Sequence, residues 1–228
     1  MLTRVSRRRE FLRAIAGVAA GGYAAGPWAR AQAQGSARRQ VAIGGKRIRV
    51  IDVHCHCIIP VTDVVRGTPL EKSGGGGGNN LLGPQRLEVM DQQGVDIQAL
   101  SINGFWWYAA ERGLAERIVR AQNEGLARWV AQHPDRFVAM ASVALQHPDL
   151  AARQLEDAAR LGLRGVSIGG HVNGEDLSLP KYDPFWAKAA ELGALVFMHP
   201  GGAEKIVKGG LLGGGGSSGS ALTLVTRY

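Results

Sequence analysis

Hydrophobic residues in this chain follow two different patterns, and segments with one pattern alternate along the sequence with segments of the other. Runs that are apolar at nearly every position predict short strands buried on both faces. Between these runs, apolar residues recur every three or four positions, which is typical of a helix with one buried face. The predicted strands are 95–102, 136–143, 163–168 and 194–199, and the predicted helices are 84–94, 113–133, 149–162 and 183–193.

Glycine and proline mark the ends of these elements. Residues 41–54 are expected to form a β-hairpin with Gly44 and Gly45 as its two-residue turn. Pro84 suits the first turn of a helix, and a glycine ends three of the predicted helices, where the chain commonly adopts left-handed geometry. The loop 71–80 contains five consecutive glycines and is flexible by composition.

Strands that alternate with helices predict an α/β fold with parallel strands. A doubly wound sheet and a (β/α)8 TIM barrel both fit this alternation. A barrel is favoured because no G-x-G-x-x-G motif opens a helix after the first strand, and because histidines and other polar residues stand where the predicted strands end. We therefore predict a TIM barrel of which this chain holds about the first five βα units.

Residues 1–33 have the composition of an export signal. An arginine cluster precedes an Ala/Gly-rich apolar stretch that is too short to span a membrane, and small residues near Ala31 permit cleavage. The stretch "RREFLR", which contains Arg8 and Arg9, resembles the bacterial twin-arginine signal. The expected location is periplasmic or secreted, after export in the folded state.

The net charge of +8 raises the question of nucleic-acid binding. Residues 1–33 hold six arginines against one glutamate, a net charge of +5, which leaves +3 for the remainder. That remainder has no basic stripe interleaved with aromatic residues, so nucleic acid is not an expected partner.

The chemistry-bearing residues concentrate in "IDVHCHCIIP", residues 51–60. Side chains alternate between the two faces of a strand, so His54 and His56 share one face and Cys55 and Cys57 the other. Two imidazoles at the mouth of a barrel provide half of a metal site, and His199 ends the fifth strand across the same mouth. Imidazole ligands suit Zn²⁺ or a similar divalent ion, and an open coordination position permits water activation. The cysteines are predicted to pack in the core.

These motifs resemble the amidohydrolase superfamily, in particular the branch typified by aminocarboxymuconate semialdehyde decarboxylase. The resemblance covers about two thirds of the chain. The stretches that carry it are "DVHCHCIIP", "MDQQGVDIQALS", "NEGLARWVAQHPDRFVAMASVALQHPDLA", "LGLRGVSIGGHVNGEDL" and "ELGALVFMHP".

The resemblance implies one divalent metal, Zn²⁺ with Mn²⁺ as the alternative, held by His54, His56 and His199. It implies that Asp52 orients a neighbouring group. The residues that it places near a carboxylic acid substrate are His171, Asn103, Trp106, Trp107 and Tyr108, with loop or rim packing as the alternative role. His133 and His147 each precede Pro-Asp at an element junction, so we expect structural roles for them.

The sequence departs from the family pattern both in the residue that binds the substrate carboxylate and in the residues of the metal site. Only Arg66 and Arg86 are candidates for the family's carboxylate-binding arginine. The 29 residues after His199 contain no His and no Asp, so the family's strand-six His and strand-eight Asp have no counterpart. We expect a truncated or frame-shifted sequence that leaves the pattern near Gly209. The predicted organisation is a signal peptide (1–33), a partial barrel (34–205) and a Gly/Ser-rich tail (206–228).

Three functions remain open. The first is non-oxidative decarboxylation of an unsaturated or aromatic carboxylic acid. The second is hydrolysis of an amide, lactone or ester at the same metal, and the third is an inactive fragment that only binds metal. The expected binding partner is a small-molecule carboxylic acid, and no membrane span is expected. Unpaired edge strands predict association between chains, for example as a homodimer.

Overall fold

The computed structural model describes residues 38–74, 80–104 and 106–199. By its contacts the chain divides into two units, 1–38 and 39–228, and nearly all of the described residues belong to the second. The predicted signal peptide and Gly/Ser-rich tail lie outside the described residues. Within the described ranges, no helix is both long enough and apolar enough to cross a membrane.

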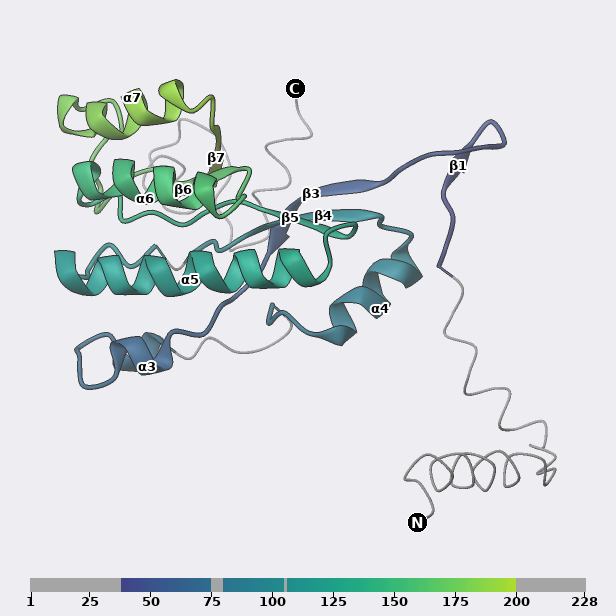
Figure 1. Cartoon of the computed structure of the whole chain (residues 1–228), viewed down its shortest axis with the longest axis horizontal. Helices are drawn as coiled ribbons and strands as arrows, with labels where there is room; N and C mark the ends of the chain where they lie inside the picture. Colours follow the sequence, from purple (N-terminus) through teal and green to yellow (C-terminus); the bar gives the residue numbers. More distant parts are fainter. Residues whose placement is uncertain (1–37, 75–79, 105, 200–228) are drawn as a thin grey trace, which may run out of the picture. The chain divides into compact units, whose positions relative to one another are not determined.

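Helices and strands alternate through the second unit as the hydrophobic pattern predicts (Figure 1). The strands are β1 (Ala42–Ile43), β2 (Lys46–Arg47), β3 (Ile51–His56), β4 (Ile97–Ser101), β5 (Phe137–Ala139), β6 (Gly165–Gly169) and β7 (Leu195–His199). The α-helices are α3 (Thr62–Val65), α4 (Pro84–Gln93), α5 (Arg112–Gln132), α6 (Pro148–Arg160) and α7 (Asp183–Glu191). Two short 3-10 helices cover Glu71–Ser73 and Pro180–Tyr182.

Local sequence signals account for several of these boundaries. Gly44 and Gly45 have φ values of 56° and 75°, the left-handed pair that a tight hairpin between β1 and β2 requires. Pro84 begins α4, and Gly94 ends it in left-handed geometry with its N–H on the carbonyls of Asp91 and Met90. The Glu111 carboxylate caps α5 by accepting the N–H groups of the next turn.

The five strands from β3 to β7 are parallel and follow one another in chain order. One sheet has the order β3-β4-β5 and another pairs β6 with β7. Ala141, just beyond β5, joins them, because its N–H donates to the Gly165 carbonyl at 2.8 Å and its carbonyl accepts the Ser167 N–H at 2.9 Å. A doubly wound sheet would reverse its strand order, so this succession supports the barrel type. The number of βα units beyond residue 199 stays a prediction.

The helices cover the strands and enclose the apolar core. α5, α6 and α7 lie side by side in chain order (Figure 1). One buried cluster contains Leu100, Phe137 and Met90 between β4, β5 and α4, and another contains Ile168 and Phe185 between β6 and α7. Burying such side chains contributes about 1.5 to 3 kcal/mol each and fixes the strands that carry the polar residues described below.

The expectation of burial on both faces was wrong for β7, and β3, the other outer strand, is exposed in the same way. β6 is buried throughout, but Ile51 and Val53 of β3 and Leu195 and Met198 of β7 are more than half exposed. β3 and β7 have a hydrogen-bonded neighbour on one side only among the described strands. Outer strands lack the second neighbour that would cover them, which the hydrophobic pattern of a single strand does not reveal.

Candidate metal centre

The last residues of β3 carry two histidines on one face of the strand. Cys55 and Cys57 on the other face are 4% and 1% exposed and pack in the core, which confirms their predicted role. The pairing with β4 shifts register between Asp52 and Cys55, so His54 stands at an irregularity of the strand. Such irregularities re-aim side chains and are frequent next to functional sites.

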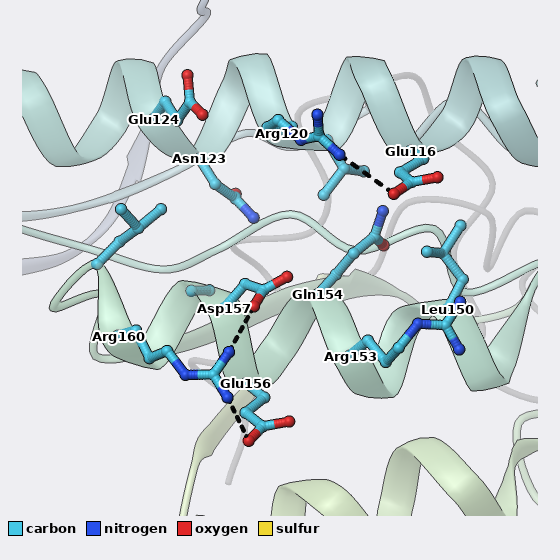
Figure 2. A pocket seen from close by; sticks show the side chains of 13 residues that line it. Glu116, Arg120, Asn123, Glu124, Leu150, Arg153, Gln154, Glu156, Asp157 and Arg160 are labelled. Atoms are coloured by element: carbon cyan, nitrogen blue, oxygen red, sulfur yellow. Dashed lines mark hydrogen bonds and ion pairs between the residues drawn. The ribbon is translucent and has the colours of Figure 1, made fainter.

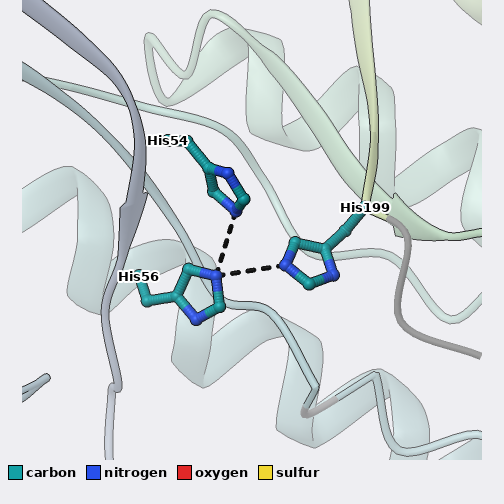
Figure 3. A group of neighbouring side chains, drawn as sticks. All are labelled: His54, His56 and His199. Atoms are coloured by element: carbon teal, nitrogen blue, oxygen red, sulfur yellow. Dashed lines mark hydrogen bonds between the residues drawn. The ribbon is translucent and has the colours of Figure 1, made fainter. Parts of the chain in front are cut away.

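His199, the last residue of β7, meets these two histidines. The Nε2 atoms of His54 and His56 lie 3.0 Å apart, and those of His56 and His199 lie 3.1 Å apart (Figure 3). The three ring centroids are 5.0 Å from one another. One nitrogen from each ring lies within 4.8 Å of the others, so the predicted trio converges on a single point.

The donor set fits a divalent metal. Ligand nitrogens about 2.0 to 2.1 Å from a common ion are about 2.9 to 3.4 Å apart in octahedral or tetrahedral geometry, and both Nε2 separations fall in that interval. Burial, followed by the charge of His54, lowers the pKa of His56. Burial and the charges of the other two histidines lower the pKa of His199 to about 4. The His56 and His199 rings are therefore favoured in the neutral form that metal coordination requires.

Aromatic residues from the loop after β4 lie beside His199. The Trp106 ring is 5.9 Å from the His199 ring and stacks on Tyr108 at 6.0 Å, with an angle of 14° between the planes. Burial raises the pKa of Tyr108 to about 12, so its hydroxyl stays protonated, and its oxygen accepts the Gly169 N–H at 3.3 Å. Trp107 instead packs against the cluster around α3 and α5.

Asn103 belongs to a buried polar network. Its Nδ2 donates to Ser101 Oγ at 2.8 Å, and its Oδ1 accepts from Ser167 Oγ at 2.6 Å. All three side chains are less than 9% exposed. The network joins the carboxyl end of β4 to β6, so in this structure Asn103 connects the two strands.

The remaining predicted residues lie at the edges of the site. His171 Nδ1 accepts the Gly174 N–H at 3.0 Å, which corresponds to the alternative role of loop packing. The Asp52 carboxylate accepts the backbone N–H of His54 at 3.2 Å and thus holds the strand rather than a ring nitrogen. His133 ends α5 in contact with Trp129, and His147 precedes α6, as their structural assignment predicts.

Neither candidate arginine is placed to anchor a substrate carboxylate. Arg66 is exposed and pairs with Asp63. Arg86 directs its guanidinium to the His56 carbonyl and to Gln98, a contact that the sequence analysis missed. One sequence signal could have indicated this contact. Arg86 lies close to Leu87 and Met90, which are apolar positions of a helix that faces the core.

A hollow with a volume of about 480 Å³ lies elsewhere, between α5 and α6 (Figure 2). Its charged side chains pair within their own helices, Arg120 with Glu116 and Arg160 with Glu156 and Asp157. None of the three converging histidines lines it. It is a gap between two neighbouring helices and is separate from the histidine cluster.

Comparison with known families agrees with the fold. A family model described as amidohydrolase matches residues 51–225, which is more than half of the chain and includes all three histidines. The chain belongs to the amidohydrolase family. The match extends past Gly209 into the segment set apart as a tail, so the boundary at 206 stays a prediction.

Similar members of this family are decarboxylases by name. Gamma-resorcylate decarboxylase of Rhizobium radiobacter is 35% identical over 123 residues, which are 50% of this chain and 38% of that protein. The 2-amino-3-carboxymuconate-6-semialdehyde decarboxylase of Dictyostelium discoideum is 28% identical over 183 residues, 78% of this chain and 43% of that protein. The chain thus spans less than half the length of these relatives.

Solved structures show the same arrangement of elements. The crystal structure of 2,6-dihydroxybenzoate decarboxylase in complex with 2,6-dihydroxybenzoate has a TM-score of 0.57 at 28% identity, over 71% of this chain and 55% of that one. That of 5-carboxyvanillate decarboxylase from Sphingomonas paucimobilis has a TM-score of 0.57 at 25% identity, over 67% and 52%. The amidohydrolase fold is therefore shared over the described βα units.

Proposed function

We propose that His54, His56 and His199 hold one divalent metal in a non-oxidative decarboxylase of aromatic or unsaturated carboxylic acids. The observation that carries the proposal is the convergence of three Nε2 atoms at separations of 3.0 and 3.1 Å. A purely structural trio would need a proton shared between each pair of rings, yet His56 Nε2 faces both of the others. One bound ion satisfies all three nitrogens together.

A bound Zn²⁺ or Mn²⁺ would act as a Lewis acid on an oxygen of the substrate. The chain's own residues supply the binding surface. The Trp106–Tyr108 stack offers an aromatic face next to His199, and offset aromatic stacking contributes about 0.5 to 1.5 kcal/mol beyond the buried area. Because Tyr108 stays neutral, this wall adds no negative charge that would repel a carboxylate.

The names of the relatives support decarboxylation over hydrolysis. Gamma-resorcylate, 2,6-dihydroxybenzoate and 5-carboxyvanillate, from which their names derive, are flat aromatic acids, the shape that an aromatic wall accepts. Hydrolysis of an amide, lactone or ester would use the same three histidines and is the competing activity.

Metal content tests the ligands. The purified chain should bind about one equivalent of Mn²⁺ or Zn²⁺, and His54→Ala with His56→Ala should remove it. The matched control is His133→Ala, because this ring contacts Trp129 and Phe137 at the other end of the fold's strands. Equal metal content in the double variant and the unchanged chain would refute the assignment.

Ligand binding and product release test the substrate class. 2,6-Dihydroxybenzoate should quench tryptophan fluorescence in the metal-loaded chain, and Trp106→Phe should reduce the quenching. Metal-dependent release of carbon dioxide from hydroxybenzoates supports the lyase. Metal-dependent cleavage of a phenyl ester or lactone, without release of carbon dioxide from any acid, would assign the hydrolase instead.

A further inference from the structure

Arg86 in the first turn of α4 reaches behind the metal centre. Its Nη2 donates to the backbone carbonyl of His56 at 2.7 Å, and its Nη1 donates to Gln98 Oε1 at 2.9 Å. The same Nη2 lies 3.4 Å from the Asn80 carbonyl. One guanidinium therefore touches the last residue of β3, a side chain of β4 and the last residue of the loop 71–80.

These contacts fall where the regular pairing of β3 ends. The Cys57 N–H still bonds the Ser101 carbonyl of β4 at 2.9 Å. The next residue, Ile58, donates its N–H to the Asn80 carbonyl at 2.9 Å, which Arg86 also approaches. Arg86 thus completes a junction of three chain segments at the peptide that carries the His56 side chain.

The partners of Arg86 are uncharged. Its hydrogen bonds in the described part of the chain go to two carbonyl oxygens and one amide oxygen, and no ion pair with a carboxylate is formed there. A guanidinium offers a rigid fork of donors that can bridge several acceptors at once. Removing Arg86 would leave the His56 carbonyl and the Gln98 side-chain oxygen without this donor.

We propose that Arg86 is a positioning residue for the metal centre, which holds the carboxyl end of β3 so that the His56 ring points at the shared metal position. This role rests on the proposed metal site. Partners that fix a metal ligand matter because a displaced ligand no longer meets the geometry of the ion, and losing such a partner typically lowers metal affinity about 10- to 100-fold.

Arg136 provides a matched control. It is also an arginine whose fork holds backbone carbonyls, with Nε on the Asp96 carbonyl at 3.1 Å and Nη2 on the Asp91 carboxylate at 2.8 Å. It acts at the start of β4, the opposite end of the strand from Ser101. Its removal disturbs a helix-strand junction without touching the His56 peptide.

The experiment titrates metal-free full-length protein with Co²⁺ and follows the visible absorption of the bound ion. Arg86→Met should raise the Kd about 10- to 100-fold and alter the spectrum. Arg86→Lys, which keeps the charge but has a single donor nitrogen, should cause a smaller rise and remain testable if the Met variant does not fold. Arg136→Met should stay within about twofold of the unchanged chain, even if its melting temperature falls.

Hydrogen exchange of the metal-free protein gives a second readout. Peptides that contain residues 54–58 should exchange faster in the Arg86 variants and at the unchanged rate in Arg136→Met. An unchanged Kd in both Arg86 variants, or an equal loss of affinity in Arg136→Met, overturns the positioning role while the metal centre stands. An unchanged chain that binds no Co²⁺ overturns the metal centre itself, and this role with it.

Discussion

The buried network around Asn103 gives the sharpest stability prediction. Ser101 and Ser167 are 0% and 1% exposed, and Asn103 is 7% exposed, so water cannot replace a lost partner without rearrangement. Asn103→Ala removes two hydrogen bonds worth about 1 kcal/mol each and leaves buried hydroxyls whose desolvation costs about 1 to 3 kcal/mol more. We expect a total loss of about 3 to 5 kcal/mol in the free energy of unfolding, measured by urea denaturation of the metal-free chain.

An apolar replacement of the whole network separates lost hydrogen bonds from lost packing. Asn103→Leu combined with Ser101→Ala and Ser167→Ala removes donors and acceptors together, which can be nearly neutral. The triple variant should therefore be more stable than Asn103→Ala, although it changes more residues. The reasoning fails if Asn103→Ala costs less than about 1 kcal/mol, or if the triple variant is no more stable than the single one.

Three further outcomes follow from the same structure and sequence. A Cβ added at Gly165 would lie 2.3 Å from a backbone oxygen of β7, so Gly165→Ala should lower the free energy of unfolding by about 1 to 3 kcal/mol. The control is Gly113→Ala, which should change the free energy of unfolding little, because the nearest neighbouring atom would lie 3.6 Å from the added Cβ. The pKa of His199 is about 4 in the fold against an ordinary value of 6.5, so between pH 4 and pH 6.5 the unfolded chain binds more protons than the folded chain. The urea midpoint of the metal-free chain should therefore fall as the pH drops from 6.5 to 4. A His199→Gln variant should show a smaller fall. Replacing Arg8 and Arg9 by Lys should keep the precursor in the cytoplasm on cell fractionation, and undiminished export would count against the twin-arginine signal.

Much of the fold was predictable because its signals are local. Apolar periodicity located α4 to α7 and β4 to β7, and Gly44 and Gly45 located the hairpin turn, since neither signal depends on distant residues. The shared face of His54 and His56 followed from the two-residue period of a strand. The short helix α3 was missed because its four residues carry too little periodicity to be recognised.

The contacts that were missed are long-range. Arg86 meets the His56 carbonyl across 30 residues, and Asn103 meets Ser167 across 64. Polar residues in such positions look like surface residues in a sequence, because only the folded chain shows which acceptor each one faces. Arg86 was one of two candidates for a substrate anchor, and Asn103 was a pocket candidate with packing as its alternative; neither contact could be read from the sequence.

The arrangement of the strands explains why histidines 143 residues apart meet at 3.1 Å. β3 and β7 are the first and fifth strands in an unbroken parallel order, and in a flat sheet their backbones would be on the order of 19 Å apart at about 4.8 Å per strand. Two histidine side chains cannot span that distance, so the strands must curve toward one another, as they do in a barrel. The convergence of the three histidines is therefore a product of sheet curvature as much as of the sequence around each one. A substitution that shifts β7 against β6, such as Gly165→Ala, should weaken metal binding without altering any of the three histidines.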